Sequence, residues 1–450
     1  MSLQKNDNDA QIKNVYIKTY GCQMNIYDSE KMIDLLRPHG FVQTEIVEDA
    51  DLVILNTCHI REKASEKVHS KLGRIALLKE DKPNMMVVVA GCVAQAEGEN
   101  IIARSKCVDI VVGTQSYHNL PELIEKVKRE KAWVVHLDFY ENEKFDKLEM
   151  NNMQNKHSSF LSVQEGCDKF CHFCVVPYTR GAEFSRPFSK IYREAINLVS
   201  NGCCEITLLG QNVSAYHGLN DAGNEITLGG LIKLLAKIDG LQRIRYTTSH
   251  PNDMLSSDLL EAHATVEKLM PYIHLPIQSG SDKILKGMNR KHTRDDYFEL
   301  IEKFRAIRPN LAFSSDFIVG YPGETEEDFQ QTMDLIKHVN YAQAYSFKYS
   351  PRPGTPASIL KNQITEEEKD ARLQELQKLL IQQQTTFNQS KIGSILSVLL
   401  EKSGKYEGQL VGKSEYMQSV IVNDSNVKIG DTVKVKILSA TQNSLHGEVI

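Results

Sequence analysis

Three cysteines, Cys167, Cys171 and Cys174, lie within the stretch EGCDKFCHFCVV at residues 165–176. This spacing lets three thiolates of one loop bind a cubane iron–sulfur cluster, in which each iron takes one protein ligand. A structural metal site is usually closed, whereas three ligands leave one position open for a reactive molecule. The spacing therefore predicts a reactive cluster, and the alternative is a zinc site completed by a distant histidine. His172 lies inside the loop, and we expect it to face the solvent or the backbone.

Three more cysteines, Cys22, Cys58 and Cys92, each end a predicted strand in the first part of the chain. In an open parallel sheet, ligands bind beyond the carboxyl ends of the strands. Three cysteines from separate segments can therefore meet at one edge of the sheet, and we predict that they share a metal site. The alternative is that each is a small buried apolar residue, which is how a free cysteine usually behaves.

The remaining cysteines, Cys107, Cys203 and Cys204, are expected to be core residues without a role as ligands. Adjacent residues of a strand point to opposite faces of the sheet, so Cys203 and Cys204 are poorly placed to bind together.

The elements that must position the first set of cysteines alternate between strands and helices. The strands are predicted at residues 15–22, 51–58, 85–92 and 108–114. Strands that alternate with helical segments indicate a parallel sheet with helices on its faces. A polar connector follows, so we place an N-terminal domain at residues 12–130 and a linker at 131–152.

A second series of strands and helices surrounds the loop of Cys167. Its strands are predicted at residues 160–167, 205–212, 244–250, 272–280, 311–322 and 342–350. Six such units over about 200 residues indicate an incomplete (β/α)6-type barrel. We place this central domain at residues 153–386, and a long amphipathic helix at 365–390 ends it.

The last part of the chain, residues 387–450, contains short β segments separated by Gly, Asn and Asp. This pattern predicts a small antiparallel β-barrel. The fold class is therefore α/β, with an N-terminal parallel α/β domain, a central incomplete barrel and a small C-terminal barrel.

Several polar residues lie near the carboxyl ends of the predicted strands of the central barrel, where barrel enzymes bind their ligands, and one of them, Asp316, lies in the fifth strand. The candidates for cofactor binding are Gln211, Asn212, Ser249, Gln278 and Asp316, with His250 and Ser279 beside them. The alternative is that these residues cap helices and form turns. The glycine-rich stretch at 320–325 lacks a lysine in P-loop spacing, and we expect a tight turn there. Arg180 and Arg186 flank the cysteine loop and are candidates to contact RNA phosphate.

The composition is that of an ordinary globular protein, with 41% apolar and 25% charged residues. The first residues are polar, and no apolar run reaches membrane-spanning length, so we expect a cytoplasmic protein without a membrane partner. Nine cysteines in 450 residues are too few for a disulfide scaffold. The net charge of −5 gives no overall attraction for nucleic acid, which leaves local patches for any RNA contact.

The C-x3-C-x2-C loop resembles that of the radical S-adenosylmethionine (SAM) family, and Phe173, the aromatic residue before the last cysteine, fits the same pattern. The three-part organisation resembles the methylthiotransferases of that family. The stretches that carry this resemblance are TYGCQMNIYDSEKM, LNTCHIREKASEKV, GCVAQAEGENI, GCDKFCHFCVVPYTRGAEFSRP and LLGQNVSAY. The amino-acid sequences of these stretches are most similar to those of the branch that modifies isopentenylated adenosine in tRNA. The ribosomal-protein branch typically lacks YTRG, and both it and the threonylcarbamoyl-adenosine branch differ around the first cysteine.

The resemblance implies two 4Fe–4S clusters and SAM as cofactors. Cys167, Cys171 and Cys174 would hold the catalytic cluster, whose open iron binds SAM, and Phe173 would lie in the cofactor site. Cys22, Cys58 and Cys92 would hold an auxiliary cluster that carries the sulfur to be inserted. Residues 387–450 resemble a TRAM domain, which binds RNA in that family.

The implied reaction converts N6-isopentenyl-adenosine beside the tRNA anticodon to its 2-methylthio derivative. Hydrogen is removed from C2 of the adenine, sulfur is inserted there, and a second SAM supplies the methyl group. The implied partners are the anticodon loop and a reducing electron donor such as a flavodoxin-like protein, and we expect a monomer. The alternatives are a methylthiotransferase for another substrate, namely threonylcarbamoyl-adenosine tRNA or a ribosomal protein, and a non-catalytic RNA-binding protein that contains metal.

Overall fold

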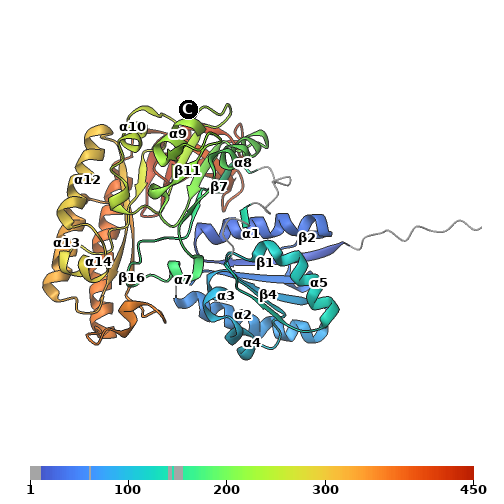
Figure 1. Cartoon of the computed structure of the whole chain (residues 1–450). Coiled ribbons are helices and arrows are strands. Elements are labelled where there is room, and N and C mark those ends of the chain that lie inside the picture. Colours follow the sequence, from blue (N-terminus) through green and yellow to red (C-terminus); the bar gives the residue numbers. More distant parts are fainter. Residues whose placement is uncertain (1–11, 60–61, 140–143, 146–155) are drawn as a thin grey trace, which may run out of the picture. The chain divides into compact units, whose positions relative to one another are not determined.

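The computed structural model describes residues 12–59, 62–139, 144–145 and 156–450. The chain forms two compact units (Figure 1). The N-terminal unit consists of residues 1–153 and 175–181, and the C-terminal unit consists of residues 154–174 and 182–450. Half of the expected linker at 131–152, namely residues 140–143 and 146–152, lies outside the described residues.

The described residues of the N-terminal unit form a six-stranded parallel sheet in the order β2-β1-β3-β4-β5-β6. The strands are β1 (Lys13–Tyr20), β2 (Phe41–Gln43), β3 (Leu52–Thr57), β4 (Met86–Ala90), β5 (Ile110–Val112) and β6 (Val134–His136). The predicted parallel sheet is confirmed. The sequence did not reveal β2 and β6, because three residues are too few to show a period. β6 also extends the sheet into the range that we expected to be linker.

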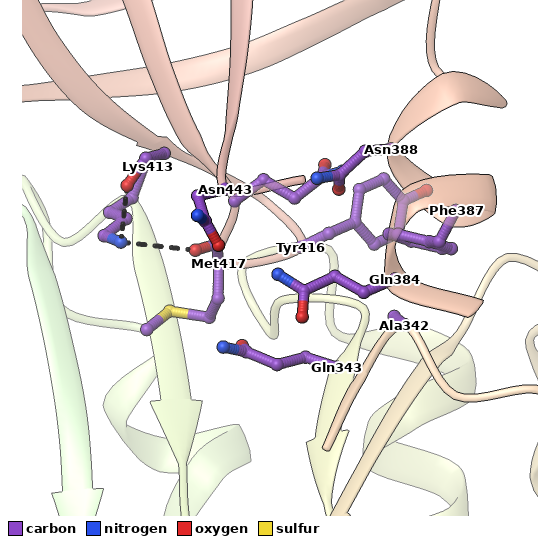
Figure 2. A pocket seen from close by; sticks show the side chains of 11 residues that line it. Ala342, Gln343, Gln384, Phe387, Asn388, Lys413, Tyr416, Met417 and Asn443 are labelled. Atoms are coloured by element: carbon purple, nitrogen blue, oxygen red, sulfur yellow. Dashed lines mark hydrogen bonds between the residues drawn. The ribbon is translucent and has the colours of Figure 1, made fainter. Parts of the chain in front are cut away.

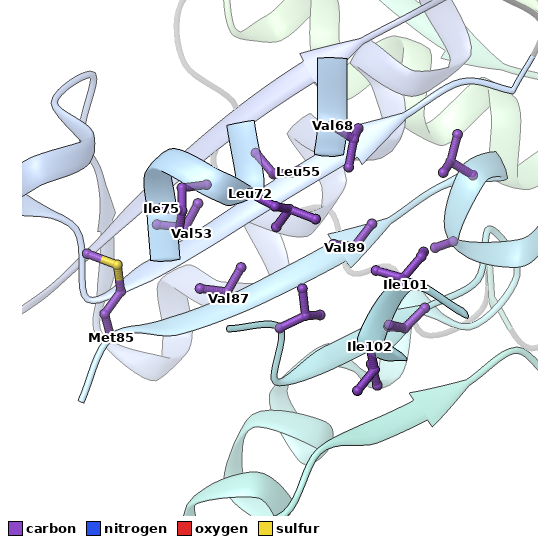
Figure 3. Packing of buried hydrophobic residues seen from close by; sticks show 14 of the residues in the cluster. Val53, Leu55, Val68, Leu72, Ile75, Met85, Val87, Val89, Ile101 and Ile102 are labelled. Atoms are coloured by element: carbon purple, nitrogen blue, oxygen red, sulfur yellow. The ribbon is translucent and has the colours of Figure 1, made fainter. Parts of the chain in front are cut away.

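Two layers of helices cover this sheet. Every residue of β3 is buried, as expected for a parallel strand that is covered on both faces. The cluster that contains Val53 and Leu55 packs against α2 (Glu62–Asp81), α3 (Cys92–Glu97) and α4 (Glu99–Arg104) (Figure 3). The alternate residues of β3, Leu52 and Ile54, pack with α1 (Gln23–Leu36) and α5 (Leu120–Glu130). The strand period of two therefore directs successive side chains to opposite helical layers.

The central strands of the C-terminal unit are parallel and follow one another in chain order. They form two three-stranded sheets, and an isolated parallel bridge joins Ile244 of the first sheet to Leu269, which precedes the first strand of the second sheet. The strands are β7 (Ser158–Ser162), β10 (Glu205–Leu209), β13 (Arg243–Tyr246), β14 (Tyr272–His274), β15 (Ala312–Val319) and β16 (Gln343–Lys348). This is the incomplete six-stranded barrel that the sequence predicted.

Helices separate these strands, and their ends carry recognisable caps. They are α8 (Phe188–Ser200), α9 (Leu228–Leu235), α10 (Ser257–Thr265), α11 (Asp282–Gly287), α12 (Arg294–Ile307), α13 (Glu326–Val339) and α14 (Glu366–Gln389). Thr293 and Asp296 form a capping box at the start of α12, and Thr325 and Asp328 form one at the start of α13. Such boxes satisfy amide groups that have no partner within the helix.

Short elements complete the description. The two hairpins pair β8 (Gln164–Glu165) with β9 (Phe184–Ser185) and β11 (His217–Leu219) with β12 (Glu225–Thr227). The helix α7 (Val176–Arg180) belongs to the N-terminal unit. The 3-10 turns are η1 (Arg37–His39), η2 (Val47–Asp49), η3 (Tyr117–Asn119), η4 (Val213–Ala215), η5 (Pro251–Asp253) and η6 (Pro356–Ile359).

The C-terminal residues form a closed five-stranded barrel in the order β17-β18-β19-β21-β20. Its strands are β17 (Ile395–Ser403), β18 (Gln409–Ser414), β19 (Ser419–Asn423), β20 (Thr432–Ala440) and β21 (Ser444–Val449). The predicted small barrel is confirmed, with one correction. β19 and β21 pair in parallel, whereas the other four pairs are antiparallel. The long connection through β20 brings β21 beside β19 in the same direction and closes the barrel.

Buried arginines attach this small barrel to the amino ends of β10 and β13. Arg243 donates to the carbonyl of Lys413, and Arg245 donates to the carbonyls of Ser414 and Glu415. The carboxylate of Glu205 lies 3.5 Å from Arg243 and 3.0 Å from Arg245, and all three side chains are almost fully buried. One carboxylate thus holds two guanidinium groups that bind the small barrel through its backbone.

The Glu205→Gln substitution is expected to lower the free energy of unfolding of the C-terminal unit by about 3 kcal/mol. Removing one partner of a buried ion pair leaves buried charge without compensation. Urea denaturation followed by circular dichroism measures the loss. The control Lys303→Gln, which breaks an exposed ion pair with Glu299, is expected to cost less than about 1 kcal/mol. Equal effects of the two substitutions would contradict the assignment.

Candidate functional site

Cys22, Cys58 and Cys92 lie at the carboxyl ends of three neighbouring strands. Cys22 is the N-cap residue of α1, Cys58 directly follows β3, and Cys92 is the first residue of α3 after β4. The strands end in register, since Tyr20 pairs with Thr57 and Asn56 pairs with Ala90. The chain places β2 on one side of β1 and β3 on the other, which makes this edge a topological switch point. Open parallel sheets bind their ligands at such points.

Two glycines let these segments approach closely. A Cβ atom on Gly21 would lie 2.2 Å from the Cβ of Cys58, and one on Gly91 would lie 2.3 Å from the amide oxygen of Asn56. Both glycines also have a positive φ, of 139° and 89°, which side chains disfavour. The glycine before Cys22 and the glycine before Cys92 are therefore required by the packing of the cysteines.

A buried amide network lies beneath the three cysteines. Asn25 accepts a hydrogen bond from the Cys22 thiol at 3.2 Å and donates to Asn56 at 3.0 Å. Asn56 in turn donates to the Asn25 carbonyl and to Ser29. Both asparagines are fully buried. The sequence did not identify either asparagine as a candidate, because each forms its hydrogen bond with a partner 31 positions away.

The surroundings of Cys22 favour a thiolate. Its pKa is lowered to about 6, chiefly by a hydrogen bond with Cys58, and burial opposes this effect. The charge of Arg180 and the backbone N–H groups of Met24 and Asn25 lower it further. A thiolate at a helix N-terminus is stabilised in this way, and the thiolate is the form that binds metal. Burial has the opposite result at Cys92, where it raises the pKa despite the opposing charge and hydrogen bond of Arg180.

The second set of cysteines lies on the loop after β8 in the C-terminal unit. The amide of Cys174 donates to the carbonyl of Cys171, which turns the loop back on itself. Arg290 is buried and places its Nη1 3.6 Å from the sulfur of Cys171. Burial raises the pKa of Cys167, and the amide of Lys169 lowers it.

Side chains from distant segments fix this loop. Gln211 accepts a hydrogen bond from the amide of Gly166 at 2.6 Å, directly before the first loop cysteine. Lys169 forms an ion pair of 2.8 Å with Asp253, and Asn289 donates to the carbonyls of Lys169 and Phe170. The loop therefore has a defined shape that does not depend on its own sequence alone.

Four candidate cofactor residues, Gln211, Asn212, Ser249 and Gln278, follow the ends of β10, β13 and β14, whereas Asp316 lies within β15 and Phe173 lies on the cysteine loop. Most of these candidates have contacts within the protein. Asn212 donates to Asp253 at 2.7 Å and accepts from the amide of His250. Asp316 lies 3.5 Å from His274. Phe173 packs against an apolar cluster that includes Met288 and Tyr321.

Two of these candidates show unusual features. The buried hydroxyl of Ser249 has no hydrogen-bond partner among the described residues. Gln278 has a positive φ of 81°, and its backbone bonds to Asp316 and Ile318. Its neighbour Ser279 lies 3.4 Å from the hydroxyl of Thr332. Binding of SAM by these residues stays a prediction.

Two sequence-based expectations about arginines are wrong. Arg180 forms a 2.7 Å ion pair with Asp28, and Arg186 forms a 2.8 Å ion pair with Glu194. Both arginines are buried. Both guanidinium groups therefore form ion pairs inside the protein and do not present their charge to RNA phosphate.

Other expectations agree with the contacts. His172 places its Nδ1 2.9 Å from the carbonyl of Gly287, so its ring faces the backbone. Cys203 and Cys204 are buried and donate to backbone carbonyls, and Cys107 packs beside an apolar cluster. The glycine-rich stretch at 320–325 forms a turn that Glu324 closes by accepting from the amide of Gly320.

The donor chemistry of both cysteine sets suits iron–sulfur clusters. Within the described residues, no three His, Cys, Asp or Glu side chains are arranged around a point that could hold one metal ion. A cluster spreads its ligands over several irons, so its thiolates need not converge on one point. Buried thiols beside arginine and helix amides fit a cluster that is ligated by thiolates.

A polar pocket of about 130 Å³ lies elsewhere in the C-terminal unit (Figure 2). Gln384 and Asn388 of α14, Tyr416 and Asn443 of the small barrel, and Gln343 contribute to its lining. Gln343 begins β16, and the lining of this pocket includes neither a loop cysteine nor a candidate cofactor residue. This pocket is therefore separate from the cysteine loop.

A helix with the length and hydropathy of a membrane span is absent from the described residues.

Three family models match successive parts of the chain. They are the uncharacterized protein family UPF0004 at residues 14–113, the radical SAM superfamily at residues 161–336 and the TRAM domain at residues 389–450. Their order is that of the sheet, the incomplete barrel and the small barrel described above.

Solved structures share the fold at low identity. The radical S-adenosylmethionine methyltransferase TsrM from Kitasatospora setae is 12% identical, with a TM-score of 0.57 over 77% of this chain and 75% of that one. The cobalamin-dependent S-adenosylmethionine radical enzyme OxsB is 11% identical, with a TM-score of 0.52 over 82% of this chain and 56% of that one.

Curated relatives match nearly the whole chain. Proteins named tRNA-2-methylthio-N(6)-dimethylallyladenosine synthase are 56% identical in Rickettsia canadensis and 58% identical in a Ruegeria species. Each match covers 97% of this chain and 99% of the relative. The chain therefore belongs to the family of the tRNA-2-methylthio-N(6)-dimethylallyladenosine synthases, within the radical-SAM methylthiotransferases.

Proposed function

We propose that this chain is a tRNA methylthiotransferase that converts N6-isopentenyl-adenosine beside the anticodon to its 2-methylthio derivative. The observation that carries the proposal is the presence of two separate sets of three cysteines, each one ligand fewer than the four irons of a 4Fe–4S cluster. The match to methylthio-adenosine synthases over 97% of the chain supports the choice of substrate.

The two sets have different roles in this proposal. Cys167, Cys171 and Cys174 hold the 4Fe–4S cluster that binds SAM, and Cys22, Cys58 and Cys92 hold the auxiliary 4Fe–4S cluster. When bound, the clusters and SAM supply a 5′-deoxyadenosyl radical for hydrogen abstraction and the sulfur for insertion. The candidate SAM contacts are Phe173, Gln211, Asn212, Ser249, Gln278 and Asp316.

The residues of the chain keep the thiolates in place and limit the access of water. The loop that carries Cys167, Cys171 and Cys174 is called the SAM loop below. Gln211 and Asn289 fix its backbone through the contacts described above. Arg290 places its guanidinium group 3.6 Å from the sulfur of Cys171 and so helps to fix the position of that sulfur. The buried positions of Cys58, Cys92 and Cys171 keep water from the clusters and from reactive species formed beside them.

RNA recognition is assigned to the small C-terminal barrel at residues 387–450, with the central domain at 153–386 and the N-terminal domain at 12–130. A base in a single-stranded anticodon loop can leave its stack at modest cost and reach a barrel mouth. We place the protein in the cytoplasm as a monomer, with a flavodoxin-like or similar donor as the source of electrons.

Anaerobic iron and sulfide analysis tests the two clusters. The reconstituted protein is expected to contain about eight irons per chain, because each 4Fe–4S cluster holds four. Replacing Cys22, Cys58 and Cys92 together by Ala should leave about four, and so should replacing Cys167, Cys171 and Cys174. As a control, replacing Cys107, Cys203 and Cys204 should leave the iron content unchanged. Stoichiometric zinc in place of iron would overturn the proposal.

Mass spectrometry of the product tests the substrate. The reduced protein is incubated with SAM and with tRNA that carries isopentenylated adenosine, and a 2-methylthio adduct is expected. The variant without Cys22, Cys58 and Cys92 should still cleave SAM to 5′-deoxyadenosine but should give at least 100-fold less adduct, because it lacks the sulfur source. An adduct only on threonylcarbamoyl-adenosine tRNA or on a ribosomal protein would reject the proposed substrate.

A further inference from the structure

The short helix α7 (Val176–Arg180) directly follows the SAM loop in the sequence but packs within the N-terminal unit. It contacts α3, the helix that begins at Cys92. The hydroxyl of Thr114 donates to the carbonyl of Thr179, and the amide of Gln115 donates to the carbonyl of Arg180 at 3.0 Å. Two side chains that follow β5 therefore hold the last turn of α7 in place.

Arg180, the last residue of this helix, is buried in the interior of the N-terminal unit. Its Nη2 donates to Asp28 at 2.7 Å, and both side chains are about 98% buried or more. Lys144 lies 3.4 Å from the other oxygen of Asp28. Burial alone would raise the pKa of Asp28, but Lys144 and Arg180 lower it. Asp28 is thus an ionised carboxylate that fixes the position of the guanidinium group.

The guanidinium group also acts on the cysteines. Its charge lowers the pKa of both Cys22 and Cys92, and its helix packs against α3, which begins at Cys92. An arginine has five N–H donors in a rigid plane, so one group can bind Asp28 and Cys92 together. Hydrogen bonds and charges near the sulfurs set the reduction potential of an iron–sulfur cluster.

We propose that Arg180 is a positioning residue of the auxiliary site, which holds the sulfur of Cys92 and sets the electron affinity of the group that the three cysteines bind. The inference rests on the proposed function and deepens it. It assigns this task to a residue that lies six positions after Cys174. The sequence therefore encodes part of the auxiliary site directly behind the SAM loop.

A redox titration of the auxiliary cluster tests the proposal. The full chain is used with Cys167, Cys171 and Cys174 replaced by Ala, so that only the auxiliary cluster contributes to the electron paramagnetic resonance signal. In this background, Arg180→Gln should lower the equilibrium constant for one-electron reduction of the auxiliary cluster at least tenfold. This change lowers the midpoint potential by about 59 mV. Arg180→Lys keeps the charge and should give a smaller shift.

Two further variants separate this effect from a general loss of packing. Asp28→Asn removes a negative charge from the same site, so the midpoint potential should move in the opposite direction, to a higher value. Arg372→Gln disrupts another buried pair, with Glu324 at 3.0 Å, and should leave the potential unchanged. If Arg180→Gln does not fold, the sign of the Asp28→Asn shift decides the question.

The possible outcomes distinguish the proposals. Loss of the auxiliary iron in Arg180→Gln, with an unchanged circular dichroism spectrum and full iron in Arg372→Gln, would also support the role of Arg180. Potentials and iron contents equal to those of the parent in Arg180→Gln and Asp28→Asn would overturn it. The absence of an iron–sulfur signal in the parent protein would instead reject the proposed function, whatever the variants show.

Discussion

The close approach of three strand ends is the constraint on which the N-terminal unit depends. Gly21 and the Cβ of Cys58 are so near that no other residue fits at position 21. The register of β1, β3 and β4 then sets Cys22, Cys58 and Cys92 along one edge of the sheet. The buried core on each face of the sheet, which Figure 3 shows for one face, keeps these strands in that register. Without that core, three residues that are 34 to 70 positions apart would have no reason to meet.

The two cysteine sets reach similar chemistry by different routes. The loop set is local, because C-x3-C-x2-C places three sulfurs on one short segment. The auxiliary set depends on tertiary structure, since each sulfur comes from a separate strand. In both sets a buried arginine from outside the ligand segments acts on a cysteine: Arg290 lies 3.6 Å from the sulfur of Cys171, and the charge of Arg180 opposes the burial that raises the pKa of Cys92. A buried anionic sulfur needs such compensation, because the interior solvates charge poorly.

Much of this architecture follows from local patterns. The six central strands and the helix α14 were predictable because apolar periodicity and capping residues such as Thr365 are encoded nearby. The cysteines stood out because of their type and spacing.

The contacts that support the cysteines could not be predicted. Asn56 and Arg290 have ordinary neighbours in the sequence, and their roles come from partners 31 and 119 positions away. The charges of Arg180 and Arg186 suggested RNA contact, but both arginines form ion pairs with buried carboxylates in the folded protein. The parallel pairing of β19 with β21 likewise depends on barrel closure and not on any local pattern.

The position of α7 affects how this protein can be divided. The N-terminal unit consists of two pieces of chain, and the second piece, Val175–Gly181, follows the SAM-loop cysteines. A fragment that stops before residue 154 would omit the guanidinium group that pairs with Asp28 and would leave a buried carboxylate with one fewer partner. The N-terminal unit is therefore not an interchangeable cassette. A chimaera that exchanges sulfur-donor domains between related enzymes must transfer both pieces together, and so must cut the chain on either side of the SAM-loop cysteines.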